Sequence, residues 1–313
     1  MIRRFGAVLL VLWAMSAATA FAHVVSDKEI VLLRALPLAL VRELRAESLP
    51  DTITGQCGVN RSGWQHIAHQ RGALLVLASA AAQADSVHAE QAWRSLDAAF
   101  RSQKPDGLFT REVDARVPES DVMAAVDWAG ETCRALVVVT NGPLRKRFQF
   151  RYSLLLPKLE KVVRALEPGA AARDSVNARD AAAQLAHAQL FLLADGIYHD
   201  PAFGAAGQRA ISNARALQRP DGAFLLRGTP APLARQALCL QRLQSITQYF
   251  PAPSLESALR RGATWLARSA LRAPRRLSAL DRHEVALALA LAGQRSGDPE
   301  VVAAARKLAG MGR

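Results

Sequence analysis

The stretch Gln103–Phe109 reads Gln-Lys-Pro-Asp-Gly-Leu-Phe, and Gln218–Phe224 repeats it as Gln-Arg-Pro-Asp-Gly-Ala-Phe. We name these the first and the second repeat turn; their aspartates lie 115 residues apart. Each copy follows one apolar helical pattern and precedes another, which indicates an internal repeat. Proline stops a helix, Asp accepts a backbone hydrogen bond, and Gly supplies the positive φ of a tight turn. The residues expected to form these structural turns are Gln103, Asp106, Gly107, Phe109, Gln218, Asp221, Gly222 and Phe224.

Apolar residues recur at helical spacing through most of the chain. The predicted helices span Lys28–Ser48, Trp64–Ala84, Val87–Ser102, Ser120–Val139, Leu144–Leu166, Asp174–Ala194, Ala205–Leu217, Leu233–Tyr249, Ser254–Leu271, Arg282–Gly293 and Pro299–Ala309. Pro157 lies inside one of them and should kink or restart it. No stretch shows sustained period-two alternation, so we expect no sheet.

Helices joined by short connections favour antiparallel hairpins that bury their apolar faces on their neighbours. The pattern predicts an all-α fold, an α/α toroid of about five to six helical hairpins in one domain over residues 23–313. A helical solenoid is the alternative, but no repeat of about 34 residues is present.

Residues Met1–Ala22 have the pattern of a cleavable signal peptide. Arg3 and Arg4 form a basic start, an apolar run follows, and Ala20 and Ala22 occupy the small-residue positions before the cleavage site. An uncleaved membrane anchor is the alternative, but the apolar run is shorter than the ~20 residues of a spanning helix. We therefore expect a periplasmic or secreted protein, cleaved after Ala22, with no transmembrane segment in the mature part.

The chain is strongly basic, with a formal net charge of +13. Loss of Met1–Ala22 removes Arg3 and Arg4 and no acidic residue, which lowers this charge to +11. A basic exported protein meets anionic partners such as lipopolysaccharide, acidic polysaccharide, polyphosphorylated lipid or released nucleic acid. No nucleic-acid-binding motif is present, so we predict no nucleic acid partner.

The segments around the two repeat turns resemble the terpenoid-cyclase and protein-prenyltransferase superfamily of α/α toroids. In Leu96–Cys133 a helix ends in Gln-x-Pro-Asp-Gly-x-Phe and leads through the acidic loop Glu112–Asp114 into a second helix; Arg215–Leu243 is a shorter copy. The resemblance implies the toroid fold. It carries no activity by itself, because toroids of this kind support unrelated functions.

The chemical motifs of that superfamily are absent from this sequence. The zinc site of the prenyltransferases needs Asp two residues before a Cys, where Glu131 and Ala237 stand before Cys133 and Cys239. The chain has no Asp-Asp pair of the cyclase type, and Gln56–Asn60 departs from the thioester motif of complement-type toroids. We predict no metal site and no cofactor.

Four polar or aromatic residues on one predicted helix form a candidate site. Asp127 and Glu131, at i and i+4, share a face and could form an acid/base couple inside a toroid. Trp128 and Arg134 are the candidate ligand-binding residues beside them. The alternative is a pair of carboxylates that is ion-paired to Arg134 or to a neighbour.

A second candidate lies in the connection that contains Tyr198 and His199. Tyr and His are the acid/base pair of polysaccharide lyases on α/α toroids, so we add both residues to the candidate catalytic set. The alternative is that Asp200 and Pro201 simply start the next helix. His66 and His69, at i and i+3, could ligate a metal, but without a visible third ligand we interpret them as a polar helix start.

The chain has three cysteines, so one disulfide at most can form within it. We prefer the pairing of Cys57 with Cys133 and interpret Cys239, which stands in an apolar stretch, as a buried thiol.

These observations predict an exported, prenyltransferase-like α/α-toroid protein that binds an anionic glycan or a lipid-linked small ligand in its central funnel. The alternative is a carbohydrate-active enzyme, a polysaccharide lyase or a glycoside hydrolase. A third possibility is an inert scaffold.

Overall fold

The fold is all-α, as predicted. The computed structural model describes residues 29–35, 67–101, 103–108, 118–177, 179–272, 274 and 277–310. Residues 29–35 are helical. The other elements are α3 (Ile67–Ala82), α4 (Ser86–Arg101), α5 (Pro118–Asn141), α6 (Arg145–Asn177), α7 (Ala181–Tyr198), α8 (Pro201–Ala216), β1 (Leu225–Leu226), β2 (Thr229–Pro230), α9 (Leu233–Tyr249), α10 (Pro253–Arg272), α11 (Ala279–Ser296) and α12 (Pro299–Gly310). Among the helices in these ranges, none has both the length and the hydropathy of a membrane span.

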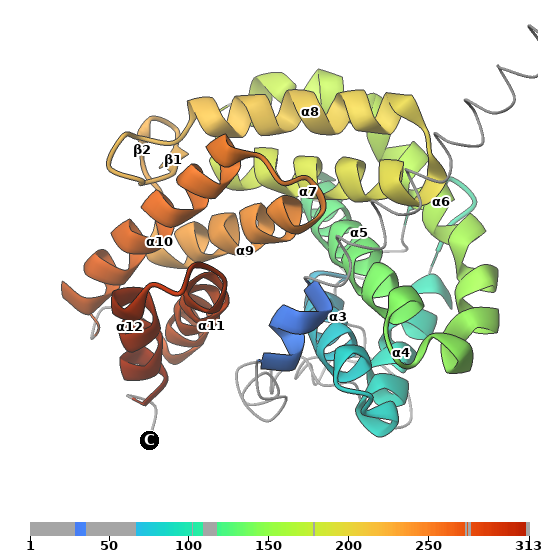
Figure 1. Cartoon of the computed structure of the whole chain (residues 1–313). Helices are drawn as coiled ribbons and strands as arrows, with labels where there is room; N and C mark the ends of the chain where they lie inside the picture. Colours follow the sequence, from blue (N-terminus) through green and yellow to red (C-terminus); the bar gives the residue numbers. More distant parts are fainter. Residues whose placement is uncertain are drawn as a thin grey trace, which may run out of the picture.

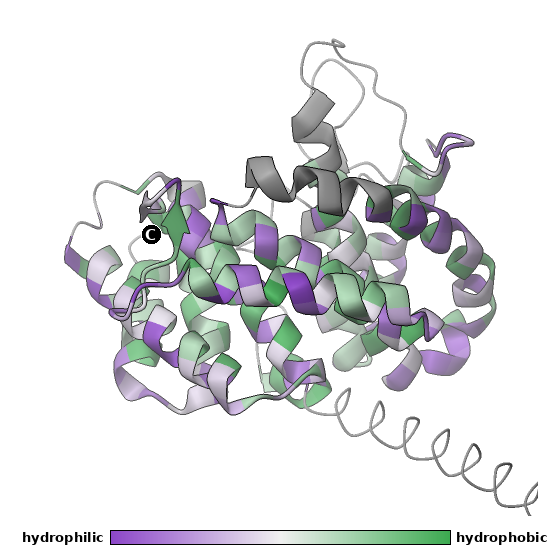
Figure 2. Cartoon of the chain, turned by 90° about the horizontal axis from the view of Figure 1, so that it is seen from above, coloured by the Kyte–Doolittle hydropathy of each residue, from purple (hydrophilic) through white to green (hydrophobic). Residues whose placement is uncertain are grey.

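The helices form two layers. In the inner layer, α3, α5, α7, α9 and α11 pack side by side in chain order. Each of them carries the next helix of the chain, α4, α6, α8, α10 or α12, on its outer side, so that the two layers follow one arch (Figure 1). Hydrophilic and hydrophobic positions alternate around the outer helices, as expected for helices that bury one face (Figure 2).

The connections at one end of the helices differ from those at the other end. The inner helices lead into the outer ones through short turns, residues 83–85, 142–144, 199–200, 250–252 and 297–298. The outer helices lead back through longer connections, residues 102–117, 217–232 and 273–278, and through the short link 178–180. All inner helices therefore run in the same direction. We call the side of the molecule at which the inner helices finish the short-turn end. The inner helices begin at the opposite end.

The helical segment 29–35 bridges the two sides of the arch. Arg34 Nε donates to the Ala82 carbonyl at 2.8 Å, and Gln83 Nε2 donates to the Leu33 carbonyl at 3.1 Å, which ties the segment to the end of α3. Its other side lines a cavity together with residues of α10 and α11. The segment thus lies between the first and the last inner helix (Figure 1).

The two repeat turns have the same local geometry. Asp106 Oδ1 accepts from Leu108 N at 3.0 Å, and Asp221 Oδ1 accepts from Ala223 N at 3.1 Å. Gly107 and Gly222 follow with φ of +90° and +103°, a region in which a side chain is strained. The predicted tight turns are confirmed at the residues that the structure describes; Phe109 lies outside them.

Each repeat turn also docks on the next outer helix. Gln103 Nε2 donates to its own turn at Gly107 O (3.0 Å) and to Lys158 O of α6 (2.9 Å). Gln218 Nε2 does the same to Gly222 O (3.1 Å) and to Ala258 O of α10 (2.9 Å). The repeat therefore links α4 to α6 and α8 to α10.

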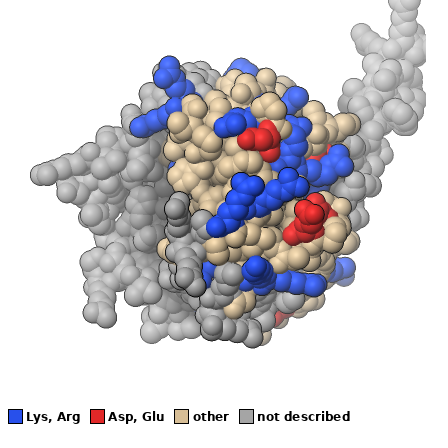
Figure 3. Space-filling model, turned by 90° about the vertical axis from the view of Figure 1, so that its left-hand side faces the viewer, with Lys and Arg blue, Asp and Glu red and all other residues tan. Residues whose placement is uncertain are grey.

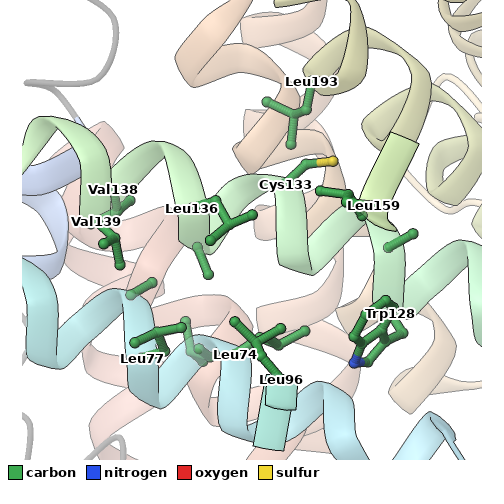
Figure 4. Packing of buried hydrophobic residues seen from close by; sticks show 14 of the residues in the cluster. Leu74, Leu77, Leu96, Trp128, Cys133, Leu136, Val138, Val139, Leu159 and Leu193 are labelled. Carbon is green, nitrogen blue, oxygen red and sulfur yellow. The ribbon is translucent and has the colours of Figure 1, made fainter. Parts of the chain in front are cut away.

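The core divides at α7. One buried cluster lies mainly between α3, α4, α5, α6 and one side of α7, and it also includes residues of segment 29–35, Phe203 of α8, Tyr249 of α9 and Leu291 of α11. The other cluster lies between the opposite side of α7 and α8 to α12. Because both sides of α7 are covered, this helix is apolar nearly all round. In the first cluster, Leu74 and Leu77 of α3 face Leu136 and Val139 of α5 (Figure 4).

One local prediction was wrong in part and another in full. Pro157 was predicted to kink or restart its helix, and α6 continues through it without a restart. Ser153, whose carbonyl loses its helical donor there, lies on the exposed side of α6, where water can replace the missing N–H. A short hairpin also occurs where no strand was expected: β1 and β2 pair around Arg227 and Gly228, both with positive φ, as in a type I′ turn.

We expect Gly222→Ala to destabilise the protein far more than Gly228→Ala. Both glycines have positive φ, which costs an alanine about 1 kcal/mol. A Cβ at Gly222 would also stand 2.2 Å from the Arg261 carbonyl oxygen, whereas a Cβ at Gly228 meets nothing within 4 Å. Urea unfolding should therefore show a loss of about 3 kcal/mol or more for Gly222→Ala against about 1 kcal/mol for the control. Equal losses would contradict the docking role of the repeat turn.

Candidate functional site

The face of α5 that carries the candidate residues Asp127 and Glu131 points toward the neighbouring inner helices. Asp127 forms an ion pair with Arg242 of α9, and the second terminal nitrogen of Arg242 donates to the Ala182 carbonyl at the start of α7. One helical turn further along α5, Glu131 accepts from Gln189 Nε2 of α7 at 3.1 Å. The carboxylates therefore join three inner helices.

Arg134 completes this face and ties it to the N-terminal segment. Its Nε donates to Glu29 Oε1 at 2.7 Å, and its Nη1 lies 3.5 Å from Glu131 Oε2. The side chains of Arg134 and Glu29 are 3% and 0% exposed. Burial alone would lower the pKa of Arg134, but the charges of Glu29 and Glu131 outweigh it and hold that pKa above its ordinary value. This is a buried ion pair.

We name Glu29, Asp127, Glu131, Arg134, Gln189, Arg242 and Ser245 the inner cluster. It contains three carboxylates and two guanidinium groups. Each carboxylate contacts an arginine, which is the alternative that the sequence left open for Asp127 and Glu131. The arrangement is that of a structural network between α5, α7 and α9.

Trp128 and Arg134 were predicted to bind a ligand, but neither offers surface for one. Trp128 is fully buried and meets the ring of Phe100 edge-on, with 5.2 Å between the ring centroids. It points toward α4, on the side of α5 away from the inner cluster. Arg134 is 2% exposed and engaged by Glu29.

Tyr198 and His199 lie far from the inner cluster. Tyr198 ends α7 and donates its hydroxyl to the Leu156 carbonyl of α6 at 2.9 Å. Burial raises its pKa above the ordinary tyrosine value. His199 is the left-handed C-cap of α7, with φ of 54°. Ten residues of helix, about 15 Å, separate it from Gln189, which contacts Glu131. The structure does not bring the four candidate catalytic residues together, and their catalytic role stays a prediction.

A cavity that the sequence analysis missed lies at the short-turn end. It has a volume of about 750 Å³ between segment 29–35, the end of α9, the start of α10 and the end of α11. The described residues that line it are Val31, Leu32, Ala35, Gln248, Glu256, Leu259, Arg260, Gln294, Arg295 and Ser296.

Two polar side chains of this cavity have groups without a hydrogen-bond partner among the described residues. Gln248 is 3% exposed, and no hydrogen bond of its amide occurs within the described part of the chain. Arg295 forms an ion pair with Glu256 and donates to the Thr247 carbonyl, but its Nη1 is buried and lacks a partner. Because a buried polar group without a hydrogen bond costs free energy, these groups mark a place where a ligand or ordered water would bind.

The sequence carried a weak signal for this cavity. Gln241, Gln244 and Gln248 recur at i, i+3 and i+7 along α9, and all three are buried. Three amides on one face of a buried helix are unusual, because such groups need hydrogen-bond partners. The pattern indicates a polar interior, but it does not say which of the three meets a cavity.

Cys133 and Cys239 are free thiols in the core, so the preferred pairing of Cys57 with Cys133 is wrong. Cys133 lies beside Leu159 and Leu193 (Figure 4). Cys57, His66 and the predicted signal peptide lie outside the described residues, as does the side chain of His69. Among the His, Cys, Asp and Glu residues that the structure does describe, no group of three could hold a metal ion.

Comparisons with known proteins add no family: no protein-family model, curated protein or solved structure matches this chain.

We expect Arg134→Met to lower the free energy of unfolding by about 3–5 kcal/mol, because it leaves the Glu29 carboxylate buried without its partner. The double variant Glu29→Gln/Arg134→Met should recover at least about 1 kcal/mol of this loss in urea unfolding. A double variant that is less stable than Arg134→Met would show that the two residues do not act as a pair.

The two buried thiols should be inert in the native protein. Burial raises the pKa of both Cys133 and Cys239 to about 12, so at pH 8 almost none of either thiol is ionised. In a Cys57→Ser variant, we expect no rapid reaction with Ellman's reagent at pH 8, and reaction of both thiols in guanidinium chloride. Rapid native labelling would contradict the burial of these residues.

Proposed function

We propose that this protein binds a small ligand that has an apolar body and an anionic group, in the cavity at the short-turn end. The observation that carries the proposal is a cavity of about 750 Å³ whose lining contains the buried, unpartnered Nη1 of Arg295 and the amide of Gln248, which has no hydrogen bond within the described part of the chain. Cavities of this size suit small molecules, which bind to apolar walls through a few polar anchors.

The walls of the cavity favour an apolar ligand body. Val31, Leu32, Ala35 and Leu259 line it, and Val31 is 64% exposed although it is a branched aliphatic residue. An aliphatic or ring-shaped ligand would cover this surface. Each Å² of apolar surface so removed from water contributes roughly 25 cal/mol.

The charges of the cavity favour an anionic group. Arg260 is exposed and has no ion pair within the described residues. Arg295 offers its buried Nη1, while Glu256 is already engaged by the other atoms of Arg295. A carboxylate, sulfate or phosphate could accept from both arginines, and the Gln248 amide could contact the same ligand.

The finer fold that we propose is an α/α toroid of the type seen in terpenoid cyclases and protein prenyltransferases. Two features support it: the inner helices run in one direction with outer partners, and segment 29–35 bridges the first and last of them. The identical docking of the two repeat turns supports the resemblance found in the sequence.

We further propose that the protein is exported, with cleavage after Ala22, as its basic and apolar N-terminal sequence suggests. The mature chain would retain Glu29 and hence the ion pair with Arg134, so cleavage and the fold are compatible. Mass spectrometry of protein secreted by a bacterial host would test the cleavage site.

The cavity is tested with anilinonaphthalene sulfonate, an anionic apolar dye that fluoresces when it is bound. We expect saturable binding to the folded protein, displacement by decanoate, and weaker displacement by the uncharged decyl glucoside. Arg260→Glu should weaken binding of the dye at least about tenfold, equivalent to about 1.4 kcal/mol. Lys146→Glu is the matched control: it reverses one exposed positive charge that has no ion pair among the described residues, at the start of α6 and outside the cavity lining.

Equal weakening by Arg260→Glu and Lys146→Glu would show a general charge effect and overturn the site. Gln248→Met separates a binding residue from a structural one. It removes an amide that has no partner, so the unfolding free energy should stay the same or rise by about 1 kcal/mol while decanoate binds more weakly. A loss of stability together with unchanged binding would assign Gln248 to the fold.

A further inference from the structure

A second site lies on the outer layer, in the groove between α8 and α10. The groove has a volume of about 570 Å³ and is lined by the arginines Arg215 and Arg261 with the polar residues Ser212, Gln218, Ser254 and Ser257. Arg261 is held in place: it donates to Ser257 Oγ at 2.8 Å and to Gln218 Oε1 at 3.1 Å. Arg215 is exposed and has no side-chain partner among the described residues.

The arginines of this groove are not neutralised by carboxylates. None of the described residues that line it is acidic, and Asp221 of the nearby repeat turn pairs with Arg219 at 3.2 Å. Positive charge without a local counter-charge, next to hydroxyl groups and an amide, is suited to a negatively charged and hydroxyl-rich ligand.

The corresponding groove of the first repeat shows that this charge is not required by the fold. The groove between α4 and α6 lies beside the first repeat turn and is smaller, about 270 Å³. Its Arg151 contacts two carboxylates, Glu90 at 2.6 Å and Asp97 at 3.0 Å, and stacks over Trp93. At the position of Arg215, three residues before the turn glutamine, the first repeat has the buried Phe100. The same docking geometry therefore occurs without an arginine at that position.

The basic surface continues beyond the groove along α10. Arg261, Arg268 and Arg272 are exposed at i, i+7 and i+11, which places them on one side of the helix over about 16 Å. Arg306 and Lys307 of the neighbouring α12 are exposed as well. Figure 3 shows this side of the molecule, where Lys and Arg side chains predominate over acidic ones.

We propose that the α8–α10 groove and the basic side of α10 bind an acidic polysaccharide. A linear array of positive charges that starts in a hydroxyl-lined groove fits a chain of sugars bearing carboxylate or sulfate groups. No large apolar side chain is exposed on the described parts of α8, α10 or α12, so the face lacks the residues that enter a bilayer. The aromatic residue of α10, Trp265, is partly buried and packs against the core.

The test uses the full mature chain with immobilised polygalacturonate and heparin as probes. We expect Arg215→Glu to lower the affinity for both at least about tenfold. Lys146→Glu is the matched control, because Lys146 is also exposed and has no side-chain partner among the described residues but lies at the start of α6. It should change the affinity less than about twofold. Equal effects of the two variants would overturn the site, because any loss of positive charge would then act alike.

Two further measurements keep the outcome clear. Thermal unfolding of Arg215→Glu checks that the fold is intact, and Arg261→Gln, which keeps a hydrogen-bonding side chain, should also weaken binding at least about fivefold.

Phosphatidylglycerol vesicles and an oligothymidylate are the competing partners. Tighter binding of either one than of the polysaccharides would overturn the proposed ligand class. The cavity is tested with a dye and Arg260→Glu, and the α8–α10 groove with polysaccharides and Arg215→Glu. A negative result for one site therefore does not decide the other.

Discussion

The contact of a glycine with the backbone of the next outer helix is the constraint on which the outer layer depends. Gly107 lies against the Lys161 carbonyl and Gly222 against the Arg261 carbonyl, closer than any side chain would allow. The glutamine that opens each turn then donates both to the turn and to the same outer helix. Because every outer helix also packs on its own inner helix, these contacts fix the angle between the first and second helical hairpins and between the third and fourth.

The inner layer depends on polar contacts in addition to apolar packing. α7 separates two apolar clusters, and the inner cluster connects the helices on its two sides through Asp127, Glu131 and Arg242. Such buried pairs contribute little net stability, because each ion must leave water. They penalise wrong arrangements instead, since a shift of α5 against α9 would leave a charge buried without its partner. The Glu29–Arg134 ion pair has the same effect on the position of segment 29–35 against α5.

The sequence predicted what depends on local chemistry. Helices were found because their apolar spacing and their prolines are local signals, and the repeat turns because Asp and Gly act on their own backbone. The restart predicted as one alternative at Pro157 does not occur, because the carbonyl that loses its hydrogen bond, that of Ser153, lies on the exposed side of α6. The Asp127–Arg242 pair joins residues 115 positions apart, and the cavity needs segment 29–35 beside α9, α10 and α11. No local pattern contains such information.

The two repeats separate what the fold requires from what it leaves free. Both contain the same turn, the same glutamine bonds and the same close approach of glycine, so these features belong to the architecture. The grooves beside them differ: three residues before the turn glutamine stands the buried Phe100 in the first repeat and, in the second, the exposed Arg215, which has no side-chain partner among the described residues. A position whose chemistry changes while the surrounding geometry stays the same is not explained by folding. For that reason the difference between equivalent positions is better evidence for a binding surface than the basic net charge, which any exposed residue could supply.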